Sequence, residues 1–195
     1  MAISPEDRRK IIHHHAANVI GVMNETESAI DDQATSVGSA SWPAVAADIA
    51  SMRTMLSTQK AALQTWYNTW RNGDPAEPAQ PTYLGVFGTP AAYVNNLEDA
   101  ASIPTLTRNN YAAMSLIAMA LENLYSIAIA LETNAPGLKE VAMDALEATI
   151  PIVESLSETV CTATVRALHD QDSTIPMSAA TTAIQDTQAA WSGTT

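Results

Sequence analysis

The chain is poor in cysteine, glycine, aromatic residues and basic side chains. Its 195 residues include one cysteine, seven glycines, ten aromatic residues and nine lysines or arginines, against 21 acidic residues. Few glycines and few aromatic residues favour helix over sheet. The single cysteine, Cys161, excludes an internal disulfide framework and is compatible with a reducing compartment. We therefore expect a helical protein that is cytoplasmic, or part of a particle assembled in the cytoplasm.

Signatures of catalysis are also missing. The sequence has no Walker-type phosphate loop, Gly-x-Ser-x-Gly, His-Glu-x-x-His or dinucleotide-binding glycine pattern. Cys161 and His169 are eight residues apart, which is about 12 Å along a helix and too far for a local thiolate pair. We therefore expect a non-enzymatic protein without a cofactor or a metal ion.

A local excess of positive charge occurs at the start of the chain. Residues 1 to 10 carry a net charge of +1, whereas residues 11 to 195 carry six basic and nineteen acidic side chains, a net charge of −13. Nucleic-acid binding draws most of its affinity from Lys and Arg that neutralise phosphates, so no specific nucleic-acid partner is expected. The first ten residues are polar and no apolar stretch follows them, so a secretory signal is not expected either.

Helix start and stop signals predict one all-α domain over residues 1 to 195, a bundle of four long helices of about thirty residues. Ser4 before Pro5 begins the first helix, and Gly73 ends the second. The predicted helices are residues 5 to 34, 43 to 72, 105 to 133 and 136 to 169, with a short C-terminal docking helix at 178 to 191. Residues 73 to 104, rich in proline and glycine, form a long crossover between the two hairpins, with a short helix at 89 to 101.

Two hairpins joined by a long crossover resemble ferritin-like bundles in outline. An up-down bundle with an excursion fits the sequence equally well. Di-iron proteins of the ferritin-like class use Glu-x-x-His ligands, which this chain lacks, and residues 43 to 72 contain neither glutamate nor histidine. We therefore exclude di-iron chemistry.

Apolar residues recur at alternating spacings of three and four along the first two predicted helices. The first seam is Ile12, Ala16, Val19, Met23, Thr26 and Ile30, and the second is Val45, Ile49, Met52, Leu56, Gln59, Leu63, Trp66 and Trp70. This spacing is typical of an antiparallel helical hairpin or of a coiled coil. The C-terminal helix is expected to dock through Met177, Ile184 and Trp191.

Residues 111 to 131 are apolar almost all round, which is typical of a central core helix or of a membrane span. The polar residues of this helix share one narrow arc: Arg108, Ser115, Glu122, Ser126 and Thr133. We expect this arc to face solvent or a polar seam, and we expect no membrane partner. The alternative is that Glu122 is a buried ligand-binding or proton-handling group.

The predicted helix at 136 to 169 has an acidic face. Five carboxylates share it: Glu140, Asp144, Glu147, Glu154 and Glu158. Carboxylates spaced along one helix are usually solvated, since oxygen-rich cation sites draw on loops or on several helices. Pro151 lies on the same face and predicts a kink, because water can satisfy the carbonyl group that it frees.

The basic opening stretch is the first candidate for partner binding. Its members are Arg8, Arg9, Lys10, His13, His14 and His15. Consecutive helical residues point about 100° apart, so the three histidines cannot close on one metal ion. The stretch is either a solvated helix end or an electrostatic docking tip, which gains charge below about pH 6.5.

Aromatic residues near the crossover are the second candidate. Trp66, Trp70, Tyr83 and Phe87 lie at the end of the second predicted helix and in the crossover. They either form a small local core or present a recognition surface, since aromatic anchors on loops often carry binding.

These patterns predict a non-enzymatic structural subunit that acts through protein–protein contacts. Its partners would be further copies of itself or other subunits of an assembly such as a virus particle, although no residue points to that particular class. Two alternatives stay open: a helical bundle that binds a small ligand or metal at Glu122, and a membrane-active protein that uses residues 111 to 131.

Overall fold

The computed structural model describes residues 3–38, 41–71 and 102–193. Its helices are α1 (Pro5–Ser36), α2 (Pro43–Arg71), α4 (Ile103–Ala130), the 3₁₀ turn η1 (Glu132–Asn134), α5 (Leu138–Gln171) and α6 (Ser178–Ser192). No strand occurs in these ranges. The prediction of four long helices and a short C-terminal helix is confirmed. The short helix expected at 89 to 101 lies outside the described residues, as do Tyr83 and Phe87.

Local signals explain where the helices begin. The Ser4 side chain accepts a hydrogen bond from the Asp7 backbone N–H at 3.1 Å, as an N-cap does. The last long helix was expected from Pro136 but begins at Leu138. Gly137 adopts the left-handed conformation, with φ of +79°, which is incompatible with a right-handed helix and suits glycine. Further along, α5 passes through the exposed Pro151 without a break.

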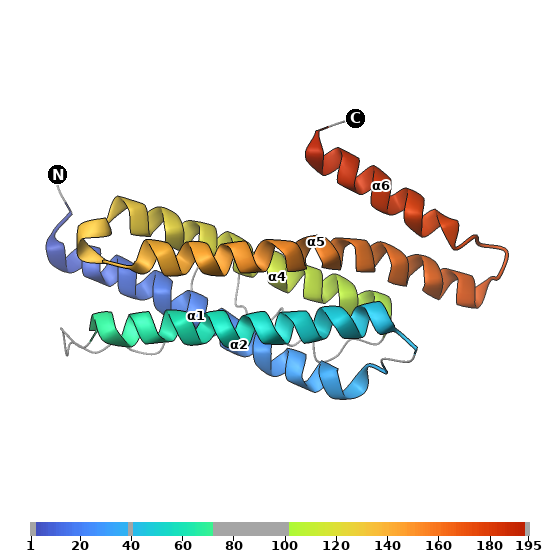
Figure 1. Ribbon diagram of the computed structural model, residues 1–195, viewed down its shortest axis with the longest axis horizontal. Coiled ribbons are helices and arrows are strands. Elements are labelled where there is room, and N and C mark those ends of the chain that lie inside the picture. The colour runs from blue at the N-terminus through green and yellow to red at the C-terminus, as the bar shows by residue number, and fades with distance from the viewer. Residues whose placement is uncertain (1–2, 39–40, 72–101, 194–195) are drawn as a thin grey trace.

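The helices pack as two antiparallel hairpins, α1 with α2 and α4 with α5 (Figure 1). The start of α1, the end of α2 and η1 meet at one end of the bundle, here called the tryptophan end. At the opposite end the side-chain amides of Gln33 and Asn110 bond to each other at 3.0 and 2.8 Å. Arg71 and Ile103 therefore lie at opposite ends, and α2 and α4 run in the same direction (Figure 1). The directions of the described helices agree with the predicted pair of hairpins and not with an up-down bundle.

The predicted seams form the core. All six residues of the first seam are buried, and so are the aliphatic residues Val45, Ile49, Met52, Leu56 and Leu63 of the second. Gln59, Trp66 and Trp70 are half-buried. Side chains of α4 and α5 complete the same cluster, with Met114, Ile117 and Leu156 among them. The apolar residues whose spacing predicted the antiparallel hairpin are therefore the residues that pack α1 against α2.

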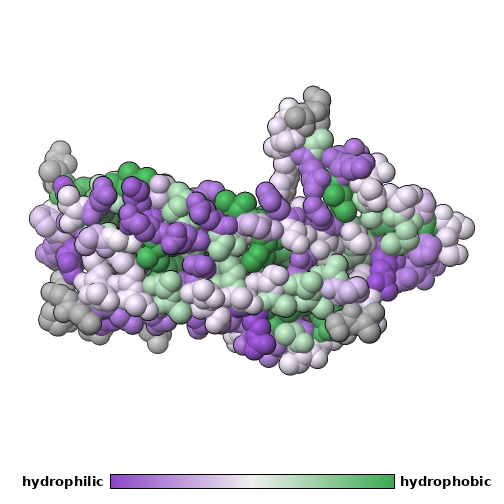
Figure 2. Space-filling view, in the orientation of Figure 1, coloured by the Kyte–Doolittle hydropathy of each residue, from purple (hydrophilic) through white to green (hydrophobic). Residues whose placement is uncertain are grey.

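The C-terminal helix docks less closely than predicted. It diverges from the bundle axis (Figure 1), and in Figure 2 it stands out from the body as a prong. Ala180 is its one buried residue, Ile184 is half-buried, and Met177 and Trp191 are 39% and 59% exposed. The Trp191 ring stacks on Tyr111 of α4, with centroids 6.2 Å apart. Of the three expected anchors, Trp191 contacts the bundle through Tyr111 and Ile184 is half-buried. Met177 and Trp191 nevertheless remain exposed, so the contact of α6 with the bundle is partial.

Candidate protein-binding site at the tryptophan end

The structure brings the basic opening stretch and the tryptophans together. The Arg9 guanidinium lies 4.7 Å from the centroid of the Trp70 ring, which is a cation–π contact. One turn later the His13 ring stacks on Tyr67, with centroids 5.5 Å apart, and His13 Nδ1 is hydrogen-bonded to the Tyr67 hydroxyl group. Two of the predicted partner-binding side chains thus contact α2 of their own chain.

Trp66 and Trp70 fix the connection between α4 and α5. The indole N–H of Trp66 donates to the Pro136 carbonyl oxygen at 2.9 Å, and that of Trp70 donates to the Asn134 carbonyl oxygen at 2.8 Å. The two residues lie one helical turn apart, so their rings stack on one face of α2 with centroids 5.5 Å apart. Both indoles are half-buried, and their first role is to hold the bundle end together.

A pocket of about 440 Å³ opens beside the stacked indoles. Its lining comes from α1, α2, η1 and the connection between η1 and α5: Arg9, Trp66, Thr69, Trp70, Thr133, Asn134 and Pro136. Indole faces offer apolar contact, hydroxyl and amide groups offer hydrogen bonds, and the guanidinium attracts carboxylates. The pocket is therefore suited to a side chain that combines an apolar stem with a negative end.

The remaining basic residues lie around this pocket or turn away from it. Arg8 is half-buried. Lys10 is exposed and forms an ion pair with Glu6 at 2.6 Å, and this hydrogen bond and the carboxylate charge raise the pKa of Lys10. His14 is exposed, with Nε2 placed 3.1 Å from the Asn18 amide nitrogen. Glu6 and Asp7 offset two of the three basic residues here, so the tip of α1 is polar with a small net positive charge.

The three histidines point to three different neighbours. His13 faces Tyr67 of α2, His14 faces solvent, and His15 Nδ1 lies 3.3 Å from the amide nitrogen of Asn123 on α4. Burial, and then the charge of His14, lower the pKa of His15. His15 therefore gains charge at lower pH than an ordinary histidine. Within the described ranges, no three His, Cys, Asp or Glu side chains are grouped closely enough to hold a metal ion.

Glu122 lies on the solvent side of α4. Its side chain is exposed, as are Arg108, Ser126 and Thr133 of the same arc, and its backbone carbonyl accepts a hydrogen bond from Ser126 Oγ at 2.9 Å. This position contradicts the alternative of a buried ligand group at Glu122. The five carboxylates of the predicted acidic face of α5 are likewise all exposed.

Among the described residues, α4 is the one helix long and apolar enough to cross a membrane, judged by length and composition alone. A single such helix is weak evidence, because the core helix of a soluble protein passes the same test. Leu106, Met114, Ile117, Leu121 and Leu124 of α4 are buried in the bundle core.

Three features of the tryptophan end were not predicted: the contact of Tyr67 with His13, and the carbonyl groups of Asn134 and Pro136 as acceptors for the indoles. The spacing of Trp66, Tyr67 and Trp70 was a signal for an aromatic cluster, but not for its contacts. Comparison with known proteins adds no assignment, since no family model, curated protein or solved structure matches this chain.

Proposed function

We propose that the protein is a non-enzymatic assembly subunit, whose tryptophan end docks on an acidic surface of a neighbouring subunit. The observation that carries this proposal is the convergence of Arg9, Trp66 and Trp70 around a pocket at the net positive start of α1. Positive charge is scarce elsewhere on a chain with a net charge of −12. A cationic tip with an aromatic pocket favours partners with carboxylates, because complementary potentials steer association and fix its register.

The acidic face of α5 is the complementary surface that every copy carries. Its exposed carboxylates run from Glu140 to Glu158, a length of about 27 Å at about 1.5 Å per residue. Exposed ion pairs contribute only about 0 to 1 kcal/mol each, so several must act together. Because the tryptophan end of one copy would bind the α5 face of the next, the contact is head-to-tail and can repeat. Such a contact builds a closed ring or an open filament. This is the behaviour expected of a structural subunit.

The test is the mass of the protein in native solution as a function of salt. Arg9→Gln removes one positive charge at the pocket, and Arg108→Gln removes one at the opposite end of the bundle as the matched control. We expect Arg9→Gln to weaken association about two- to fivefold at low salt, the range for one exposed ion pair, and to reduce its salt dependence. Arg108→Gln should leave both unchanged.

Other outcomes would contradict the proposal. If Arg9→Gln and Arg108→Gln associated equally well, the tryptophan end would not be part of the interface. A monomer with stoichiometric bound metal would favour the metal-binding alternative, and a monomer that sediments with lipid vesicles would favour the membrane-active one.

A further inference from the structure

The outward face of α2 exposes no carboxylate, unlike the other described long helices. Fifteen of its residues are exposed, and Arg53 is the one charged residue among them. Arg53 forms an ion pair with Asp31 of α1 at 2.6 Å. The one acidic residue of α2, Asp48, is buried. The surface over α2 is accordingly mostly white to pale green in Figure 2.

Small residues on this face recur with the spacing of a helix-packing seam. The positions alternate at four and three residues: Ala47, Ser51, Thr54, Thr58, Ala61 and Thr65. We call this set the outer seam of α2. All six residues are exposed, whereas the apolar seam on the opposite side of the helix is buried. Alternating spacing of four and three is the pattern by which helices pair along their length, and small side chains allow their axes to approach closely.

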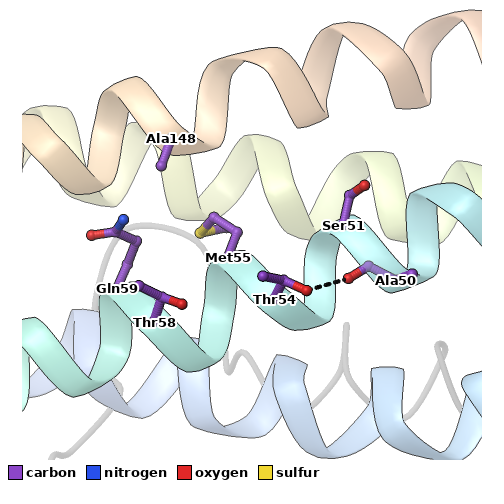
Figure 3. Close-up of a pocket in the computed structure, with 7 residues that line it drawn as sticks. All are labelled: Ala50, Ser51, Thr54, Met55, Thr58, Gln59 and Ala148. Atoms are coloured by element: carbon purple, nitrogen blue, oxygen red, sulfur yellow. Dashed lines mark hydrogen bonds between the residues drawn. The ribbon is translucent and has the colours of Figure 1, made fainter.

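Two grooves flank the middle of the outer seam. The groove between α2 and α5 has a volume of about 530 Å³ and lies beside Met55 and Ala148 (Figure 3). The groove between α1 and α2 has a volume of about 340 Å³. Ala50 and Thr54 line both grooves, so this part of α2 forms a narrow ridge with space on each side. The side chains of a second helix can enter such grooves.

We infer that a second copy of the chain pairs with this face, α2 against α2 in antiparallel orientation, about a two-fold axis between Thr54 and Thr58. The choice of a second copy follows from charge. Two copies of net charge −12 repel each other, and each of the other described helices exposes a carboxylate, such as Asp32, Glu122, Glu147 and Asp186. The outer seam of α2 has no exposed carboxylate, and the carboxylate on its flank, Asp31, is paired with Arg53. Identical acidic chains can therefore meet there with less repulsion than at the other described helices.

This pairing is separate from the contact proposed for the tryptophan end, and salt distinguishes the two. The six residues of the outer seam are uncharged, and salt screens the repulsion between the two acidic chains, so the dimer should persist or tighten as salt rises. The contact at the tryptophan end should weaken over the same range. High salt therefore isolates the α2 pair for measurement.

The variant Thr54→Glu/Thr58→Glu tests the pairing, because it places four carboxylates beside the two-fold axis. Glutamate is a good helix former and both sites are exposed, so helicity by circular dichroism should be retained. The matched control Thr181→Glu/Gln185→Glu adds the same charges at the same spacing to exposed sites of α6. Sedimentation equilibrium at high salt should give the native chain and the control twice the 20.7 kDa chain mass. The α2 variant should lose at least about tenfold in dimer affinity, because like charges are brought together.

A charge-swap experiment guards against a trivial loss of folding. Thr54→Lys/Thr58→Lys should also be monomeric alone, and its mixture with the Glu variant should restore a mixed dimer. A native chain that is monomeric at its highest soluble concentration would overturn the inference, as would a Glu variant that dimerises like the control. Unchanged monomer mass with a lowered melting temperature in the Glu variant would also overturn it, and would assign the face to residues 72 to 101 of the same chain.

Discussion

The neighbouring helices α2 and α5 have similar buried faces but different exposed faces. Each buries an aliphatic face in one core, with Met52, Leu56 and Leu63 from α2 and Ile152 and Leu156 from α5. Outside, α5 exposes five carboxylates on one face, whereas α2 exposes alanine, serine and threonine at its outer seam. The inward residues fix how the helices pack, and the outward residues decide what each helix can contact. Packing of the bundle requires the first pattern, but its stability does not require the outward faces to differ so much.

The largest expected effect is on the free energy of unfolding, and it should differ between the buried and exposed faces of α2. Leu56 is fully buried, so Leu56→Ala should lower the free energy of unfolding by about 2 to 5 kcal/mol through lost burial and a residual cavity. Thr58→Ala, on the outer seam, should change it by less than about 0.5 kcal/mol. Urea denaturation of both variants at high dilution measures this. Similar losses at the two sites would mean that the outer seam is also packed within the monomer.

A smaller effect is expected at the polar contact between α2 and α5. Asp48 is 6% exposed, and its Oδ1 accepts a hydrogen bond from Ser155 Oγ at 2.6 Å. Ser155→Ala should cost about 1 to 3 kcal/mol, because it removes a partner from a buried carboxylate. Asp48→Asn keeps the acceptor oxygen and removes the buried charge, so it should cost less than Ser155→Ala. The reverse order in thermal or urea unfolding would show that the charge of Asp48 itself stabilises the pair.

The outward face of α5 should matter least for stability. Glu147 is exposed, so Glu147→Gln should shift the free energy of unfolding by less than about 0.5 kcal/mol. The same change should weaken salt-sensitive association, since it removes a carboxylate from the proposed docking face. If Glu147→Gln changed the free energy of unfolding and left association unchanged, the outward face of α5 would serve stability and not association.

Because His15 is partly buried, the stability of the bundle should depend on the pH at which His15 gains a proton. Burial lowers its pKa in the folded chain from the usual 6.5, so below that value the unfolded chain binds the proton more readily. The stability contributed by neutral His15 is therefore present above pH 6.5 and is lost as the pH falls toward its folded pKa. His15→Gln should flatten the pH dependence of unfolding in that window. His14→Gln should flatten it only in part, because burial remains and the charge of His14 is the smaller cause of the shift. Equal slopes in the native chain and His15→Gln would contradict this.

The sequence predicted the elements that depend on local spacing. The start of α1 follows from capping by Ser4. The buried seam from Ile12 to Ile30 follows from the apolar periodicity, and both signals lie in residues close together in the sequence. The contacts of Arg9 with Trp70 and of His13 with Tyr67 could not be predicted, because they join residues more than fifty positions apart. The angle of α6 was missed for a related reason, since the geometry of the connection after Gln171 sets it.

The most direct test of the central claim, that the chain acts by assembling, is sedimentation velocity of the native protein across a salt series. At low salt we predict species larger than a dimer, because the salt-sensitive contact of the tryptophan end and the uncharged contact of α2 both form. At high salt the mass should fall to twice the 20.7 kDa chain mass and stop there. A single species of 20.7 kDa at every salt concentration would contradict the account.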